Sequence, residues 1–431
     1  MAAAAIRNSV ICGTLASVFL GALVTSAEAV PAEIVVVRAG TVITVSGREI
    51  PRGDIVIIDG KIDLVGANLE FPRTATVIDA RDKVVMPGMI NVQTRHGMRG
   101  FARNGNNSGE SAADEIVLSL VDFEPLLRHG FVTAAFVPTG NNMPGTAALY
   151  RLAGPDGPEL LDRAIYLPIS MTNPGADKNQ IRTAIRLAEA EIEKAKKARE
   201  EFDKKQREEE AKRKAEAEKN NAGQNAQNNA NAEPAKFEPP EIPANLRFFV
   251  DVLRGEASMQ AIFDLSSGSD YIHLVDVLGD HKDKFGTAFS FASNSGDFRE
   301  IVERLGEREA HVIVRPNISF LPFTTIRYSI PSELVRAGST VTTVPPVDSE
   351  PGYRIMRVRM ADLIRTGWSR EDVLKSVTMN PAKLLGLDEE SGSIEKGKRA
   401  DLIFLDADPL DPTSSVRGVM IGGEMVWEDS K

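Results

Sequence analysis

Apolar and polar positions along the chain first indicate a β-rich segment. Residues 34–45 are dense in Val, Ile and Thr, residue types that favour β-strands. Residues 53–62 contain two apolar runs separated by Asp59-Gly60. This pair predicts a hairpin, because both central residues of such a turn need positive φ. Residues 77–80 predict one further strand.

The other end of the chain shows the same pattern. Residues 416–427 contain two apolar runs on either side of Gly422-Gly423, which again predicts a hairpin. Each β-rich piece is too small to enclose a hydrophobic core by itself. We therefore expect one β domain assembled from both ends of the chain.

Between these ends, apolar runs of strand length alternate with segments of helix length. The predicted strands are 89–92, 131–138, 164–171, 258–265, 287–292, 311–315 and 338–346. This alternation is typical of a parallel α/β architecture, in which chemistry gathers at the carboxyl ends of the strands.

A charged segment interrupts the alternation. Residues 185–219 are almost entirely Ala, Glu, Lys and Arg, with opposite charges about four positions apart, which predicts a solvent-exposed helix. Residues 220–232 are rich in Asn, Ala and Gln, and we expect them to be disordered. Pro239-Pro240 marks the return to the fold. The segment is interpreted as an insertion, and a partner-binding helix is the alternative.

The composition is that of a globular protein. The chain has 431 residues, of which 42% are hydrophobic and 26% are charged. Its formal net charge of −10 argues against nucleic-acid binding and gives no attraction to anionic lipid.

The first residues resemble an export signal. Arg7 precedes an apolar stretch at residues 9–24, and Ala27-Glu28-Ala29 matches an Ala-x-Ala cleavage pattern. We expect residues 1–29 to be a signal peptide, with a membrane anchor as the alternative. The only cysteine, Cys12, lies inside this segment. The mature chain would then have no disulfide and no stable membrane span, and would lie in the periplasm or outside the cell.

Three motifs carry a resemblance to a known family. Pro87-Gly88 is followed by the short strand Met-Ile-Asn-Val and then by Gln93, Arg95 and His96. Residues 380–387 read Asn-Pro-Ala-Lys-Leu-Leu-Gly-Leu, and residues 392–402 read Gly-Ser-Ile-Glu-Lys-Gly-Lys-Arg-Ala-Asp-Leu. Together these resemble the amidohydrolase superfamily, which hydrolyses cyclic amides and related C–N bonds. The segment 141–148 most resembles its imidazolonepropionase-like branch.

This resemblance implies a fold and its domain boundaries. The fold would be α/β, a TIM-like (β/α)8 barrel with a small composite β-sandwich domain built from both chain ends. Residues 30–85 and 392–431 would form the sandwich, and residues 86–391 the barrel. The charged insertion would occupy about 190–245 within it.

The resemblance also implies zinc or another divalent metal. The family binds it through two histidines on strand one, a lysine or glutamate on strand four, single histidines after strands five and six, and an aspartate after strand eight. Here Gln93 and Arg95 stand at the paired histidines, and Asn91 replaces the family's aspartate on that strand. The strand-five and strand-six positions contain no histidine, and Pro346 stands at the aspartate. We therefore expect no metal cofactor.

Some residues near the expected strand ends remain candidates. His96 and Asp348 are the candidates for catalysis in a rearranged site. The candidates for ligand binding are Gln93, Arg95, Arg99, Asn141 and Asn294. The two arginines make a small-molecule anion the expected ligand, because guanidinium groups bind carboxylates bidentately.

Three functions follow from these observations. The leading hypothesis is an exported amidohydrolase-like protein that lacks the metal site and is catalytically impaired or binds a ligand. The second is an active hydrolase of a cyclic amide-type substrate with a rearranged site. The third is a surface or assembly protein that acts through the charged helix. Whether the chain is an enzyme, and whether it forms a homo-oligomer, stay open.

Overall fold

The computed structural model describes residues 33–429, apart from 155–156, 221–235, 292–296 and 321–322. The expected signal peptide, the expected disordered tract and Asn294 therefore lie outside the described residues. No helix in the described part of the chain is both long enough and apolar enough to cross a membrane.

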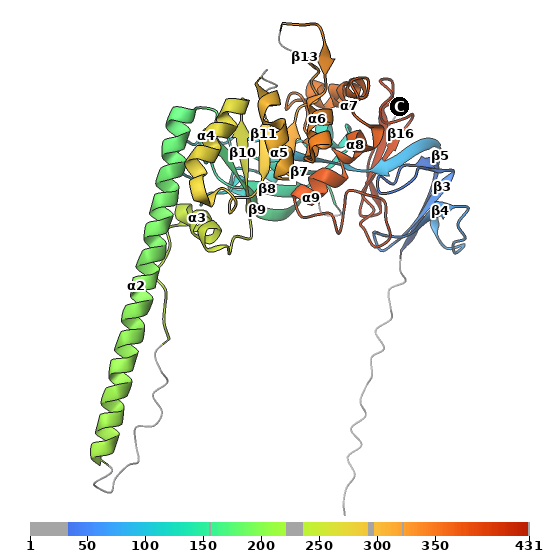
Figure 1. The fold of residues 1–431 in the computed structure, drawn as a ribbon. Helices are drawn as coiled ribbons and strands as arrows, with labels where there is room; N and C mark the ends of the chain where they lie inside the picture. Colours follow the sequence, from blue (N-terminus) through green and yellow to red (C-terminus); the bar gives the residue numbers. More distant parts are fainter. Residues whose placement is uncertain (1–32, 155–156, 221–235, 292–296, 321–322, 430–431) are drawn as a thin grey trace, which may run out of the picture. The chain divides into compact units, whose positions relative to one another are not determined.

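The β domain is one eight-stranded sheet that contains both ends of the described chain (Figure 1). The order is β18-β17-β16-β5-β1-β3-β4, with β2 paired to β1. The two predicted hairpins are present, and Asp59, Gly60, Gly422 and Gly423 all have positive φ. The strands are β1 (Ile34–Val42), β2 (Ile50–Pro51), β3 (Gly53–Ile58), β4 (Lys61–Ala67), β5 (Thr76–Pro87), β16 (Leu402–Leu405), β17 (Val416–Ile421) and β18 (Glu424–Glu428).

Strand β16 connects this sheet to the rest of the core. Its four residues are buried and alternate between two clusters, because successive side chains of a strand point to opposite faces. Leu402 and Phe404 pack in the core of the β domain, whereas Ile403 and Leu405 pack in the large cluster shared with the barrel. The β domain and the barrel thus share one strand between their cores.

The second sheet forms the barrel, in the order β15-β12-β11-β10-β9-β8-β7-β6. Seven of these strands run parallel, and β8 runs antiparallel to both of its neighbours. Its strands are β6 (Met89–Thr94), β7 (Phe131–Phe136), β8 (Ala147–Arg151), β9 (Glu159–Ser170), β10 (Gln260–Leu265), β11 (Ala288–Phe291), β12 (His311–Val314) and β15 (Thr340–Thr343). The expected TIM-like barrel is confirmed, with one antiparallel strand in its third position.

The two ends of the barrel sheet are joined by a short segment. The N–H of Thr343 in β15 donates to the carbonyl of Ser376, and the N–H of Ile90 in β6 donates to the carbonyl of Val377, each at 2.9 Å. Inside the curved sheet, Ile90, Val92 and Ile262 form part of a buried cluster. The interior is therefore a packed core, as in other barrels.

Helices cover the barrel sheet (Figure 1). The α-helices are α1 (Glu124–Leu127), α2 (Pro174–Asn220), α3 (Ala244–Arg254), α4 (Gly268–Leu278), α5 (Val302–Glu307), α6 (Ile330–Ala337), α7 (Glu350–Ile364), α8 (Arg370–Lys375) and α9 (Met379–Leu384). The 3₁₀ turns are η1 (Ala112–Asp114), η2 (Leu118–Leu120), η3 (Gly279–His281) and η4 (Phe298–Ile301), and β13 (Ser319–Phe320) and β14 (Arg327–Tyr328) form a separate hairpin.

The charged helix is the continuation of a packed one. Helix α2 begins at Pro174, and its residues Ile181, Ile185 and Ala188 are buried in the main core. The sequence interpretation of residues 185–219 as wholly exposed is therefore wrong for the first of these residues. A short amphipathic segment is hard to recognise in a sequence when a long run of charged residues follows it. Beyond residue 189 the described side chains are exposed or half-buried.

Candidate functional site

Polar side chains lie at the carboxyl ends of the barrel strands, where barrel enzymes place their chemistry. Ser170 of β9, Asp264 of β10 and Ser290 of β11 are register partners on adjacent strands. The Ser290 hydroxyl donates to Oε1 of Gln93, at the end of β6, over 3.1 Å. Because β6 is not adjacent to β11 in the sheet, this bond crosses the mouth of the barrel.

Asp348 lies beyond the end of β15 and accepts hydrogen bonds from residues at the end of β6. Its Oδ1 accepts hydrogen bonds from the Thr94 hydroxyl at 2.8 Å and the Tyr353 hydroxyl at 2.7 Å. Its Oδ2 accepts from the backbone N–H of Arg95 at 2.5 Å. Both carboxylate oxygens are thus engaged by the protein itself.

His96 is held by its surroundings on both ring nitrogens. Its Nε2 lies 2.7 Å from the carbonyl oxygen of Asp122, and a carbonyl can only accept, so Nε2 carries a proton. Its Nδ1 lies 3.3 Å from the hydroxyl of Tyr353, which itself donates to Asp348. The two expected catalytic candidates are therefore brought together, but only through Tyr353.

Arg95 is exposed at the mouth and influences two buried groups. Burial raises the pKa of the Asp264 carboxyl, and the positive charges of Arg95 and Arg315 oppose that rise. Burial likewise raises the pKa of Tyr166, and Arg95 again acts in the opposite direction. The Arg95 side chain forms no ion pair with any residue that the structure describes, so its charge is available at the mouth.

The remaining expected ligand-binding residues do not join this group. Arg99 is exposed in the long loop that follows β6. Asn141 is exposed too, and its amide nitrogen donates to the side-chain oxygen of Asn104 at 3.1 Å. The adjacent Asn142 is buried and holds the loops together instead, since its amide nitrogen contacts Asp177 at 2.5 Å. The side chain of Asn141 is thus directed to its own loop and away from the strand ends.

Comparison with known proteins finds a family similarity in the C-terminal part of the chain. A model described as "Amidohydrolase family" matches residues 352–426. Rat N-acetylglucosamine-6-phosphate deacetylase is 40% identical over 63 residues, which cover 15% of this chain and 14% of that protein. Imidazolonepropionase of Flavobacterium johnsoniae is 30% identical over 107 residues, covering 24% and 26%. The chain thus spans only a small part of these relatives' lengths.

Solved structures extend the similarity over nearly the whole chain. An amidohydrolase from Thermotoga maritima superimposes with a TM-score of 0.66 and 21% identity, covering 92% of this chain and 100% of that one. A prolidase solved with N-methylphosphonate-L-proline gives a TM-score of 0.53 and 14% identity, with the same coverage. Residues 352–426 thus match the amidohydrolase family in sequence, and nearly the whole chain shares the fold of a solved amidohydrolase.

The donor set at the strand ends does not fit the metal that the family resemblance implies. Gln93 offers one amide oxygen, which already accepts from Ser290, and Asp348 uses both oxygens within the protein. Arg95 adds a positive charge, which opposes a metal cation. Among the described residues, no three His, Cys, Asp or Glu side chains lie together as a metal site would require.

Sequence reasoning missed several residues at these strand ends. Asp264 and Ser290 lie at the strand ends, and the Tyr353 hydroxyl contacts both Asp348 and His96, yet none of the three was a candidate. Asp264 and Ser290 had one usable signal, since each is a polar residue within an otherwise apolar predicted strand. Tyr353 had no such signal, because it lies in a helix and reaches the site only through the tertiary fold.

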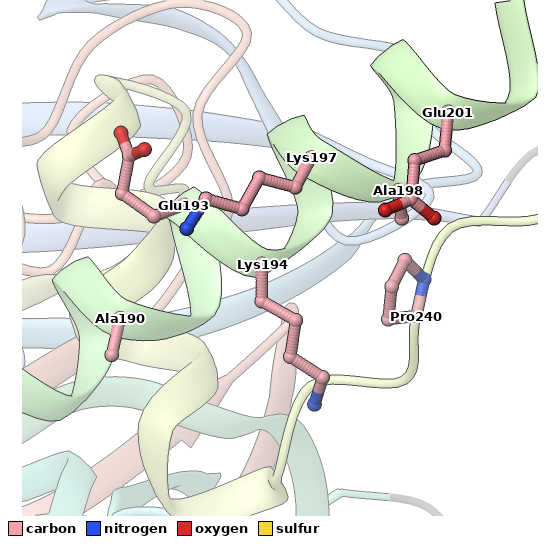
Figure 2. Close-up of a pocket in the computed structure, with 7 residues that line it drawn as sticks. All are labelled: Ala190, Glu193, Lys194, Lys197, Ala198, Glu201 and Pro240. Carbon is pink, nitrogen blue, oxygen red and sulfur yellow. The ribbon is translucent and has the colours of Figure 1, made fainter. Parts of the chain in front are cut away.

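The chain also has a surface groove, which is lined by residues outside the barrel strands. It lies between α2 and the returning segment, and Figure 2 shows Pro240 beside the helix. Its lining is Ala190, Glu193, Lys194, Lys197, Ala198, Glu201 and Pro240. Lysines and glutamates dominate this groove, and they offer no arrangement for catalysis. The strand ends therefore remain the candidate site.

Proposed function

We propose that this chain is a ligand-binding member of the superfamily that has lost metal-dependent hydrolysis, and that it binds small carboxylate-type anions at the strand ends. The observation that carries the proposal is the Arg95 side chain. It stands where the family has a metal-binding histidine, it is exposed, and it forms no ion pair with a described residue. A guanidinium at this point favours an anion and opposes a cation.

The contacts of Asp348 support the loss of hydrolysis. In the family, the aspartate after strand eight binds metal and acts as the base. Here the nearest aspartate is held by a hydroxyl, a phenol and a backbone N–H. These hydrogen bonds would have to break before the carboxylate could bind a metal. The proposal also includes export, on the basis of residues 1–29.

The alternative is turnover through His96 and Asp348 in a rearranged site. Their connection through Tyr353 is the observation in its favour. Against it, Nε2 of His96 donates to a backbone carbonyl, which fixes the ring as part of the structure. A reaction that needs this nitrogen as a base would first have to turn the ring.

One set of measurements tests the proposal. Protein purified without chelators should contain no stoichiometric zinc, iron or manganese, and should not hydrolyse cyclic amides or lactones with added metal. Acetate, succinate and phosphate should raise the melting temperature, and neutral amides should not. The Arg95→Ala variant should lose this shift, whereas Arg213→Ala, on the exposed part of α2, should keep it.

Two results would contradict the proposal. One is a tightly bound metal ion per chain, with turnover that is abolished by chelator and by His96→Ala. The other is an equal shift of the melting temperature by anions in the Arg95→Ala variant. Restoring histidines by Gln93→His and Arg95→His should not create activity, because the strand-five, strand-six and strand-eight positions still lack the family's ligands.

A further inference from the structure

The carboxylate of Asp264 is incompletely satisfied. It lies at the carboxyl end of β10, between its register partners Ser170 and Ser290. Its Oδ1 atom is buried and has no hydrogen-bond partner among the described residues. A buried acceptor without a donor destabilises the fold, so such atoms in native proteins usually have a functional or solvent explanation.

Two arginines lie close enough to Asp264 to influence it electrostatically. Arg95 follows β6 and Arg315 follows β12, and both charges act on the Asp264 carboxyl. Within the described structure, Arg95 acts on this carboxyl without an ion pair to it. The hydrogen bond between Ser290 and Gln93 shows that the ends of β6 and β11 meet across the mouth, and Arg95 is two residues beyond Gln93.

This arrangement places one carboxyl group and two guanidinium groups at the same strand ends. A simple anion would be attracted by the arginines but would leave Oδ1 of Asp264 without a donor. A simple cation would be repelled by the arginines. A molecule with both an N–H group and a carboxylate would satisfy all of them, since charged partners give the strongest hydrogen bonds.

We propose that the ligand is a small zwitterion of the α-amino-acid type, whose ammonium group donates to Oδ1 of Asp264 and whose carboxylate binds Arg95. This inference deepens the proposed function, because it rests on anion binding by Arg95 and adds a second recognition point. The third charge, on Arg315, adds to the attraction for the carboxylate and needs no direct contact.

The test uses the full-length protein and three matched sets of compounds. The first set is the free proteinogenic α-amino acids, the second their N-acetyl derivatives, and the third their C-terminal amides. N-acetylation removes the ammonium group and keeps the carboxylate, whereas amidation does the reverse. Binding is measured by titration calorimetry with the wild type, Asp264→Asn and Arg95→Ala, and with Asp280→Asn and Arg213→Ala as exposed controls.

We expect at least one free amino acid to bind, and each derivative of it to bind about tenfold or more weakly, the effect of one charged hydrogen bond. Asp264→Asn should weaken the free amino acid by a similar factor and leave the N-acetyl form unchanged. Arg95→Ala should weaken both of these. The two control variants should bind like the wild type.

The outcomes separate this inference from the proposed function. Equal binding of N-acetyl and free amino acids, unchanged in Asp264→Asn, would mean that a water molecule satisfies Asp264. The inference of a zwitterionic ligand would then be wrong, while the proposal of anion binding would stand. If no carboxylate of any set binds, both proposals fail. Because Asn has nearly the same shape as Asp, and the compounds themselves vary without any change in the protein, a folding defect cannot produce the expected pattern.

Discussion

Asp348 and its three donors show how a carboxylate at a strand end can serve the fold. Thr94 and the N–H of Arg95 come from the end of β6, and Tyr353 comes from the first turn of α7. Because the donors are fixed by two different elements, the carboxylate connects the first and last strands of the barrel at the mouth. The same connection keeps the side chain of Arg95 at the mouth by anchoring its backbone.

His311 is a second residue whose role is structural. It begins β12, so it lies at the end of the barrel opposite to the mouth, and its Nε2 is 2.7 Å from the Thr342 hydroxyl. Burial lowers its pKa from 6.5 to about 4, and the charge of Lys383 acts in the same direction. The residue is therefore neutral in the folded protein at neutral pH.

The lowered pKa of His311 predicts a loss of stability in mild acid. Between pH 6.5 and pH 4 the unfolded chain binds a proton at His311 and the folded chain does not, so the free energy of unfolding falls as the pH falls. For this one residue the loss between pH 7 and pH 5 should reach at most about 2 kcal/mol. Urea unfolding at the two pH values measures it.

The His311→Gln variant provides the comparison for this prediction. Glutamine can still contact Thr342 but does not titrate, so the variant should lose less stability than the wild type between pH 7 and pH 5. His129, whose pKa burial also lowers to about 4, remains in both proteins and contributes equally. An identical pH dependence of the two proteins would show that His311 is not the source.

At the level of elements, helix α2 has two parts with different roles. Its first turns pack against α3 and α4. Lys178 pairs with Asp276, and Glu189 pairs with His281, both in the α4 region.

The exposed part of α2 contacts the segment that returns to the barrel. The rings of Phe202 and Phe237 lie 5.4 Å apart, and the guanidinium of Arg199 lies over the Phe237 ring at 5.0 Å. The returning segment is thus attached to the exposed part of the helix.

This division predicts that the exposed part of α2 is dispensable for folding. Replacement of residues 193–234 by a short Gly/Ser linker should lower the melting temperature by only a few degrees, because the main apolar packing that it removes is that of Phe202 on Phe237. Ile181→Ala, in the buried part of the same helix, should lower the free energy of unfolding by about 2–4 kcal/mol. Circular dichroism during heating compares the two.

A larger loss of stability in the linker variant than in Ile181→Ala would mean that residues 193–234 pack on the barrel. In particular, a linker variant that fails to fold, beside an Ile181→Ala variant that is nearly as stable as the wild type, would contradict the division of α2. Replacement of residues 193–234 also tests the hypothesis of a surface or assembly protein that acts through this helix. The replacement removes the exposed helix and should leave ligand binding at the strand ends unchanged.

Across the whole molecule, the sequence predicts what depends on local pattern and misses what depends on register. The Asp59-Gly60 turn follows from its own residues, and the apolar runs locate the barrel strands within a few positions, except β8, which the sequence analysis did not predict as a strand. The antiparallel direction of β8 has no local signal. The five residues Ala147–Arg151 are all buried, and their pattern would be the same in a parallel strand. The contact of Gln93 with Ser290, 197 positions apart, depends on closure of the entire sheet.

The shared strand β16 predicts that the β domain and the barrel unfold together. The only two tryptophans report on the two parts, since Trp368 is buried beside the barrel helices and Trp427 lies in β18 of the β domain. Each single variant, Trp427→Phe or Trp368→Phe, keeps one tryptophan. In each variant, the urea midpoint measured by fluorescence of that tryptophan should equal the midpoint measured by far-ultraviolet circular dichroism. Two separated transitions in either variant would contradict a single cooperative unit.

Strand β16 also sets a constraint on synthesis. Its partner β5 is separated from it by more than three hundred residues, so a nascent chain leaving the ribosome has β1, β3 and β5 long before β16. Until then the backbone of β5 is an open edge, which can pair with another chain. A chaperone that covers this edge during translation would have its effect at this stage and none on the finished protein.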